Sequence, residues 1–274
     1  MFDFGRRTGT RNLLLLCACV STAFLSLPAR GSAEDGPVRR VLPNGMTVIL
    51  AENRAAPVVS IQVWVKAGSV QEKDGEDGVA HVHEHMLFKG TDSRGVGTIA
   101  REVEAAGGEI NAYTSWEMTV YFVNMASRFK KEGIDILADI IENAAFDKHE
   151  LAKEIEVIRE EIRRYMDMPA SRLSDMFYAT AYAVHPYGRP VIGYDEIVKG
   201  FTREDVLRFY RNWYVPENLV WVMVGDLDPE ALMPELEARL SRIPNRPLPV
   251  RKTAVEPPQS APRVFVQQED AQEA

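Results

Sequence analysis

Cysteine is almost absent from this chain of 274 residues, and its two cysteines, Cys17 and Cys19, both lie near the N-terminus. Residues 1–33 have the basic start and apolar run of a secretory signal peptide, so we expect both cysteines to be removed with it. Without cysteine, the remaining chain can form neither a disulfide nor a thiolate metal site. Any metal ion must therefore be bound by histidine, aspartate or glutamate.

Long apolar segments are also missing beyond the N-terminal region. The run from Leu13 to Leu27 is too short to cross a bilayer comfortably, and Gly31-Ser32-Ala33 supplies the small residues of a cleavage site. We therefore predict a periplasmic or secreted protein with no stable membrane span after signal cleavage. An uncleaved N-terminal membrane anchor is the alternative.

Positive charge is in deficit. The chain has 32 basic and 40 acidic residues; residues 34–274 have 28 and 39, which gives a formal charge of −11. This balance speaks against a nucleic-acid partner, since such proteins present a basic surface. Apolar residues make up 46% of the chain, which is enough for a substantial core.

Strand-like and helix-like segments follow one another between residues 38 and 240. Alternating or β-branched runs predict strands at 38–42, 46–50, 58–65, 109–114, 119–123 and 219–224. Helical spacing, capping residues and an N-terminal proline predict helices at 98–106, 127–145, 148–166, 170–182, from 203 onward and at 229–240. Residues 244–262 are proline-rich and are typical of a linker.

The stretch His81-Val82-His83-Glu84-His85 carries a candidate catalytic site. On a helix, His85 lies about 40° from His81, and Glu84 lies about 60° from His81 on the other side. Two imidazoles one turn apart can bind zinc, and the carboxylate beside them can act as a base on a metal-bound water. The order His-x-x-Glu-His is the inverzincin signature. Histidines that cap a helix or form core hydrogen bonds would produce the same short pattern by chance.

A zinc site with two histidines needs a third protein ligand. The charged helix predicted at 148–166 offers Glu154 and Glu161, which are seven residues apart and share one helix face within about 20°. Glu160 lies about 100° further round. Spacing alone does not decide among them, because a charged helix face is usually solvated.

Three features in this order resemble the insulinase family of zinc peptidases, which includes pitrilysin and the mitochondrial processing peptidase. They are the histidine motif, the strand Asn111-Ala112-Tyr113-Thr114 and the helix that carries Glu154 and Glu161. The resemblance covers nearly all of residues 36–250. It implies an α+β fold with a mixed, mainly antiparallel sheet of about five or six strands and helices packed on one face.

The resemblance also implies the roles of the site residues. His81, His85 and Glu161 are expected to bind one zinc ion per chain, Glu84 to activate the water, and Glu154 to support the site from just outside it. Glu160 is expected to point elsewhere.

The substrate is expected to lie extended against an edge strand, where Asn111, Ala112, Tyr113 and Thr114 would bind it. His83 stands where the family usually has leucine or phenylalanine, and we expect it to be packed or hydrogen-bonded rather than a ligand.

The expected function is that of a zinc-dependent endopeptidase acting on extended peptides or small unfolded proteins. The alternative is a catalytically incomplete metal-binding subunit or fragment that acts in assembly or binding with a separate partner chain. Members of the family pair two similar domains around the peptide, so full activity is expected to need a second domain or a partner chain.

We expect three regions: a signal peptide at 1–33, a zinc-binding catalytic domain at 34–245, and a linker with the start of a truncated second domain at 246–274. The chain is expected to be a fragment of a longer gene product, the catalytic half of a two-chain enzyme, or a truncated inactive product.

Overall fold

The computed structural model describes residues 36–250 and 254–268, so the expected signal peptide lies outside the described residues. The strands are β1 (Val38–Val41), β2 (Thr47–Glu52), β3 (Val58–Val65), β4 (Glu109–Thr114), β5 (Thr119–Ala126) and β6 (Leu219–Gly225). The α-helices are α1 (Val79–Met86), α2 (Thr98–Ala105), α3 (Lys130–Asn143), α4 (Lys148–Asp167), α5 (Pro169–Ala181), α6 (Asp195–Val198), α7 (Arg203–Trp213) and α8 (Pro229–Leu240). Single 3-10 turns are η1 (Ser69–Gln71), η2 (Ser127–Phe129), η3 (Pro186–Gly188) and η4 (Pro216–Asn218).

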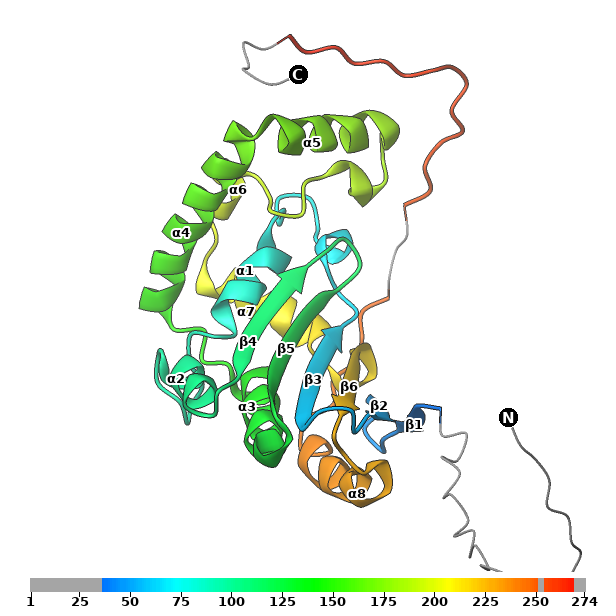
Figure 1. Ribbon diagram of the computed structural model, residues 1–274. Coiled ribbons are helices and arrows are strands. Elements are labelled where there is room, and N and C mark those ends of the chain that lie inside the picture. The colour runs from blue at the N-terminus through cyan, green and yellow to red at the C-terminus, as the bar shows by residue number, and fades with distance from the viewer. Residues whose placement is uncertain (1–35, 251–253, 269–274) are drawn as a thin grey trace, which may run out of the picture. The chain divides into compact units, whose positions relative to one another are not determined.

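The strands form one sheet in the order β1-β2-β6-β3-β5-β4 (Figure 1). Only the pair β2 and β6 is parallel, with Val48 opposite Trp221, while the other neighbouring strands of this sheet are antiparallel. Strand β4 forms one edge of the sheet and pairs only with β5 among the described strands. The predicted fold, an α+β structure with a mixed, mainly antiparallel sheet, is confirmed.

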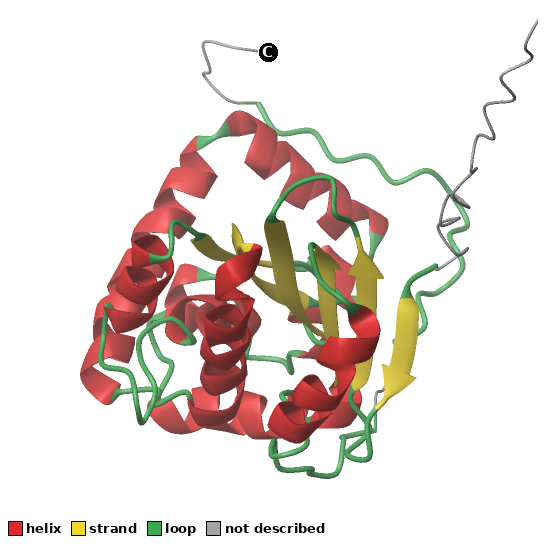
Figure 2. Ribbon diagram, turned by 60° about the horizontal axis from the view of Figure 1, so that its bottom comes forward, coloured by secondary structure: helices red, strands yellow, loops and turns green. Residues whose placement is uncertain are grey.

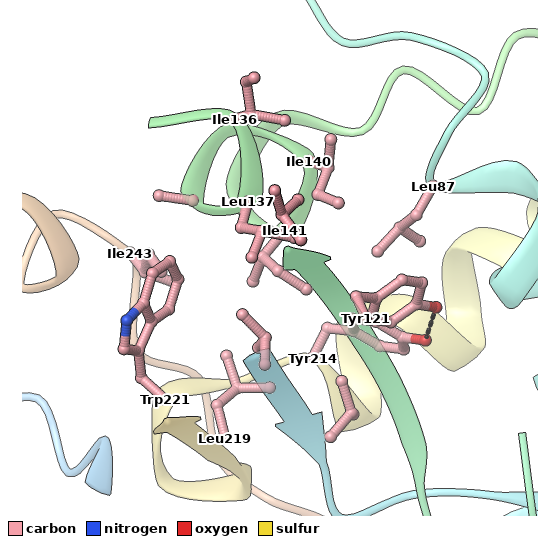
Figure 3. Close-up of a cluster of buried hydrophobic side chains, with 14 of the residues drawn as sticks. Leu87, Tyr121, Ile136, Leu137, Ile140, Ile141, Tyr214, Leu219, Trp221 and Ile243 are labelled. Carbon is pink, nitrogen blue, oxygen red and sulfur yellow. Dashed lines mark hydrogen bonds between the residues drawn. The ribbon is translucent and has the colours of Figure 1, made fainter. Parts of the chain in front are cut away.

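The helices gather on one face of this sheet (Figure 2). Alternate residues of β3, namely Ile61, Val63 and Val65, are fully buried on that face, which is the period-2 pattern of a half-covered strand. Leu137 of α3 and Trp221 of β6 belong to the same buried cluster (Figure 3). Each such side chain contributes about 1.5–3 kcal/mol through burial. These apolar contacts therefore hold the helices, including those that carry the site, against the sheet.

Carboxylates at helix N-termini define where several helices begin. Asp147 accepts hydrogen bonds from the N–H groups of the second and third residues of α4, and Asp228 makes the equivalent pair at α8. Thr202 and Asp205 form the predicted capping box of α7. These bonds satisfy backbone donors that the helix itself cannot pair.

Among the helices that the structure describes, none is both long enough and apolar enough to span a membrane. Residues 254–268 form neither helix nor strand.

Gly225 permits the tight end of β6. Its φ is +138°, and a Cβ atom there would lie 2.2 Å from the carbonyl oxygen of Val58 on the adjacent strand. We therefore expect Gly225→Ala to lower the free energy of unfolding by about 2–4 kcal/mol in urea titrations. Gly95→Ala is the matched control, because the nearest atom to its Cβ would be 4.0 Å away; it should change stability by less than about 0.5 kcal/mol. Equal stability of the two variants would contradict this explanation of β6.

Candidate active site

Two helices bring the predicted site residues together. Helix α1 buries Val82 and Met86 completely in the core, which leaves His81, Glu84 and His85 on another face of this short helix. Helix α4 packs against α1 and buries Ile155 and Ile158. The buried apolar side chains of α1 and α4 therefore determine which polar side chains of the two helices face each other.

The three predicted metal ligands converge. Oε2 of Glu161 lies 3.4 Å from Nε2 of His85 and 3.9 Å from Nε2 of His81. In a tetrahedral zinc site with bonds of roughly 2.0–2.1 Å, ligand atoms are about 3.4 Å apart. Nδ1 of His81 is buried without a hydrogen-bond partner among the described residues, so its ring is not committed elsewhere. The donor set and its spacing fit zinc.

Burial sets the protonation of His81, the first of the predicted ligands. It lowers the pKa of His81 to about 3, with a smaller contribution from the charge on His85. At neutral pH the His81 ring is therefore uncharged and keeps a lone pair, which is the form that binds a metal.

Glu154 fixes the orientation of His85, the second of the predicted ligands. Nδ1 of His85 lies 3.2 Å from Oε2 of Glu154, and Nζ of Lys89 forms an ion pair with Oε1 at 2.7 Å. Burial raises the pKa of Glu154, but the hydrogen bonds from His85 and Lys89 outweigh this effect and lower it. An ionised carboxylate can only accept, so Nδ1 of His85 carries the proton and Nε2 presents its lone pair towards Glu161.

Glu84 lies beside these donors. Thr114, at the end of β4, donates a hydrogen bond from Oγ1 to Oε2 of Glu84 at 2.6 Å. Burial raises the pKa of Glu84, and the hydrogen bond from Thr114 partly offsets this. A carboxylate held in this way, with its pKa raised by burial, has the properties of a general base.

Two residues near the motif lie away from this cluster. His83 is fully buried, with Nδ1 2.8 Å from the carbonyl oxygen of Val79 and Nε2 2.9 Å from that of Val206. Glu160 is exposed on α4 and pairs with Arg163. His83 therefore joins α1 to α7, and Glu160 points to solvent.

The predicted substrate strand, β4, forms an open edge next to Glu84. Its Tyr113 side chain is exposed, and Oδ1 of Asn111 accepts the N–H of Ala112 at 2.8 Å. That N–H is therefore not used in the pairing with β5 and faces the open edge. The hydroxyl of Thr114, by contrast, is already engaged by Glu84.

A pocket of about 350 Å³ opens from His81 and Glu84. Besides the end of β4, it is lined by Tyr178 and Asp175 of α5 and by the loop that contains Arg189. The sequence patterns did not point to these residues, because nothing in the local periodicity of α5 or of this loop indicates that they fold over the histidine motif.

Comparison with known proteins agrees with this geometry. The sequence profile of the insulinase family, peptidase family M16, matches residues 47–195, and that of the peptidase M16 inactive domain matches residues 200–274. An uncharacterized zinc protease of Rickettsia bellii is 36% identical over 202 residues, which cover 74% of this chain and 49% of the relative. A probable mitochondrial-processing peptidase subunit beta of Arabidopsis thaliana is 32% identical, over 82% of this chain and 43% of its own length.

Solved structures of proteases share the fold. A protease from Helicobacter pylori superposes with a TM-score of 0.77 at 27% identity, covering 81% of this chain and 54% of that one. The first half of the periplasmic protease PqqL from Escherichia coli gives a TM-score of 0.73 at 28% identity, covering 80% of this chain and 49% of that one.

This chain spans about half the length of the relatives that it matches. The family profile covers more than half of the chain and includes the histidine motif and the helix that carries Glu161. The chain belongs to the insulinase family of peptidases, family M16.

Proposed function

We propose that this chain is the catalytic half of a zinc-dependent endopeptidase that cleaves extended peptides or small unfolded proteins. The observation that carries the proposal is the convergence of His81, His85 and Glu161 beside the half-buried carboxylate of Glu84. The names of the relatives, which are zinc proteases and processing peptidases, support it.

His81, His85 and Glu161 would hold one zinc ion, which, when bound, acts as a Lewis acid and makes water a nucleophile near neutral pH. Glu84 accepts the proton of the attacking water and later passes it to the leaving amine. Thr114 keeps the carboxylate of Glu84 turned towards the ligands. Glu154 keeps the proton of His85 on Nδ1.

The substrate would pair with the open edge of β4, close to Glu84. Main-chain hydrogen bonds to an edge strand hold a peptide extended and make little demand on its sequence. The N–H of Ala112 is available there once the side chain of Asn111 turns away. One side chain of the substrate would enter the pocket between β4 and α5.

Full activity would require a second M16 domain, in the same longer protein or on a partner chain. The share of each relative that this chain covers, about half, supports this. We further propose a periplasmic or secreted location, in keeping with the N-terminal sequence and with the periplasmic neighbour PqqL.

Measuring zinc affinity distinguishes the role of Glu161 from that of Glu160, its neighbour on the same helix. Glu161→Gln should weaken zinc affinity at least about tenfold in a chelator competition assay, because a neutral amide oxygen replaces the negatively charged carboxylate oxygen among the three ligands. Glu160→Gln should bind as tightly as the wild type. The opposite order of the two variants would move the third ligand to Glu160.

Removing the base without removing the ligands tests the chemistry. Glu84→Gln should bind one equivalent of zinc but lose at least about 10³-fold in the cleavage rate of an unstructured peptide, since no group takes the proton from water. The wild-type chain should be assayed alone and with a candidate second half. Zinc binding without cleavage in both assays would favour the metal-binding subunit, and wild-type cleavage by Glu84→Gln would exclude Glu84 as the base.

The hydroxyl of Thr114 tests how Glu84 is held. Thr114→Val leaves an oxygen of the Glu84 carboxylate unpaired, so we expect kcat to fall about tenfold with little change in KM. Thr114→Ser keeps the hydroxyl and should retain most of the activity. A change in KM alone would assign Thr114 to substrate binding instead.

A further inference from the structure

Helix α1 begins without a capping side chain of its own. Its N-cap residue is Gly78, in the left-handed region with φ +101°, and the first turn contains no acidic residue. The first N–H groups of a helix have no partner within it, so they need an acceptor from elsewhere. His81 is the third residue of α1 and therefore lies in the turn that this deficit affects.

Glu72, which lies six residues before the N-cap Gly78, supplies the acceptors. Its Oε2 accepts the N–H of Gly78 at 3.1 Å, and its Oε1 accepts the N–H of Ala80 at 2.9 Å. The residue is only 5% exposed, and its burial raises the pKa of its carboxyl well above the usual value. Burying a carboxyl group in this way is costly unless its oxygens are paired. The two bonds to α1 are what pair them.

The segment that carries Glu72 is itself fixed to the rim of the pocket. Nη2 of Arg189 donates to the carbonyl oxygen of Glu72 at 3.0 Å, and Nη1 forms an ion pair with Asp77 at 3.0 Å. The same loop touches the helix start directly, because a Cβ atom on Gly193 would lie 2.6 Å from the Cα atom of Gly78. The start of α1 is thus held both from the Glu72 segment and from the loop at the pocket.

The three donors differ in what orients their side chains. The ring of His85 is held by Glu154, and Glu161 is the fourteenth residue of the 20-residue helix α4. Nδ1 of His81 has no hydrogen-bond partner among the described residues. The direction of the His81 ring therefore depends on the backbone of the first turn of α1, the turn that Glu72 holds.

We propose that Glu72 is a positioning residue of the metal centre, which holds the first turn of α1 so that His81 stands opposite His85 and Glu161 before an ion arrives. This inference rests on the proposed zinc function. Without Glu72, the first turn of α1 is ordered in only a fraction of the metal-free molecules. The apparent affinity for the ion is then reduced in proportion to that fraction.

Two variants of Glu72 and one matched control test the proposal. Glu72→Gln keeps the shape and one acceptor, and Glu72→Ala removes both acceptors. Asp228→Ala is the control, because Asp228 likewise accepts two backbone N–H bonds at the start of a helix, here from Glu230 and Ala231 of α8, and α8 carries no site residue. Each protein is prepared without metal, its folding is checked by near-ultraviolet circular dichroism, and its zinc affinity is measured by chelator competition well below the unfolding midpoint.

We expect zinc affinity to fall about tenfold in Glu72→Gln and further in Glu72→Ala, within the range seen when support of a ligand is lost. Asp228→Ala should lose stability but bind zinc like the wild type. If Glu72→Ala does not fold, Glu72→Gln still decides. Wild-type affinity in a folded Glu72→Gln protein would overturn the proposal.

A second measurement does not involve the metal. In the metal-free wild type, the amide protons of Gly78 and Ala80 should exchange slowly, although the first N–H groups of a helix usually exchange fast. In Glu72→Gln they should exchange at least about tenfold faster, and fast exchange already in the wild type would also overturn the proposal. Failure of the wild type to bind zinc, with slow exchange intact, would instead refute the proposed function and leave Glu72 as a structural cap.

Discussion

The candidate site depends on holding three electron-pair donors within 4.8 Å of one another, although these atoms do not attract one another. Nε2 of His81, Nε2 of His85 and a carboxylate oxygen of Glu161 meet at these distances, from two helices far apart in the sequence. Lone pairs that face each other repel, so the surrounding protein must provide the order. The apolar contacts of α1 and α4 with the core fix the positions of the two helices that carry these donors.

The polar groups around the donors complete the arrangement. Glu154 and Lys89 fix the ring of His85, and Glu72 pairs the open backbone groups at the start of α1. Burial acts on the site in two useful directions. It lowers the pKa of His81, so that the ring stays neutral, and it raises the pKa of Glu84 above its usual value, which makes the carboxylate a stronger base.

Much of the local structure could be predicted from the sequence, because strongly periodic segments report their own conformation. Strand β3 and helix α8 have the predicted bounds, and the capping box of α7 is present. Strand β5 runs on to Ala126 beyond its predicted end, because residues 124–126 still pair with β3. The short helix α6 was missed, since four residues are too few to show a period.

Long-range relations could not be predicted from the residues alone. No local pattern indicates that β2 pairs in parallel with β6, from the far end of the domain. The spacing of Glu154, Glu160 and Glu161 left the third ligand open, and only the family resemblance favoured Glu161. The role of Glu72 was invisible for a related reason: its carboxylate reaches α1 from a preceding loop, whereas sequence rules look for a cap at the residue next to the helix.

X-ray absorption at the zinc edge of the metal-loaded protein tests the central claim most directly, because it reports the atoms around the ion. The account predicts a four-coordinate ion with only nitrogen and oxygen neighbours at about 2.0–2.1 Å and the outer-shell scattering of two imidazole rings. A spectrum without imidazole scattering, or with a six-coordinate shell of oxygen atoms alone, would contradict the assignment of His81, His85 and Glu161 as the metal centre.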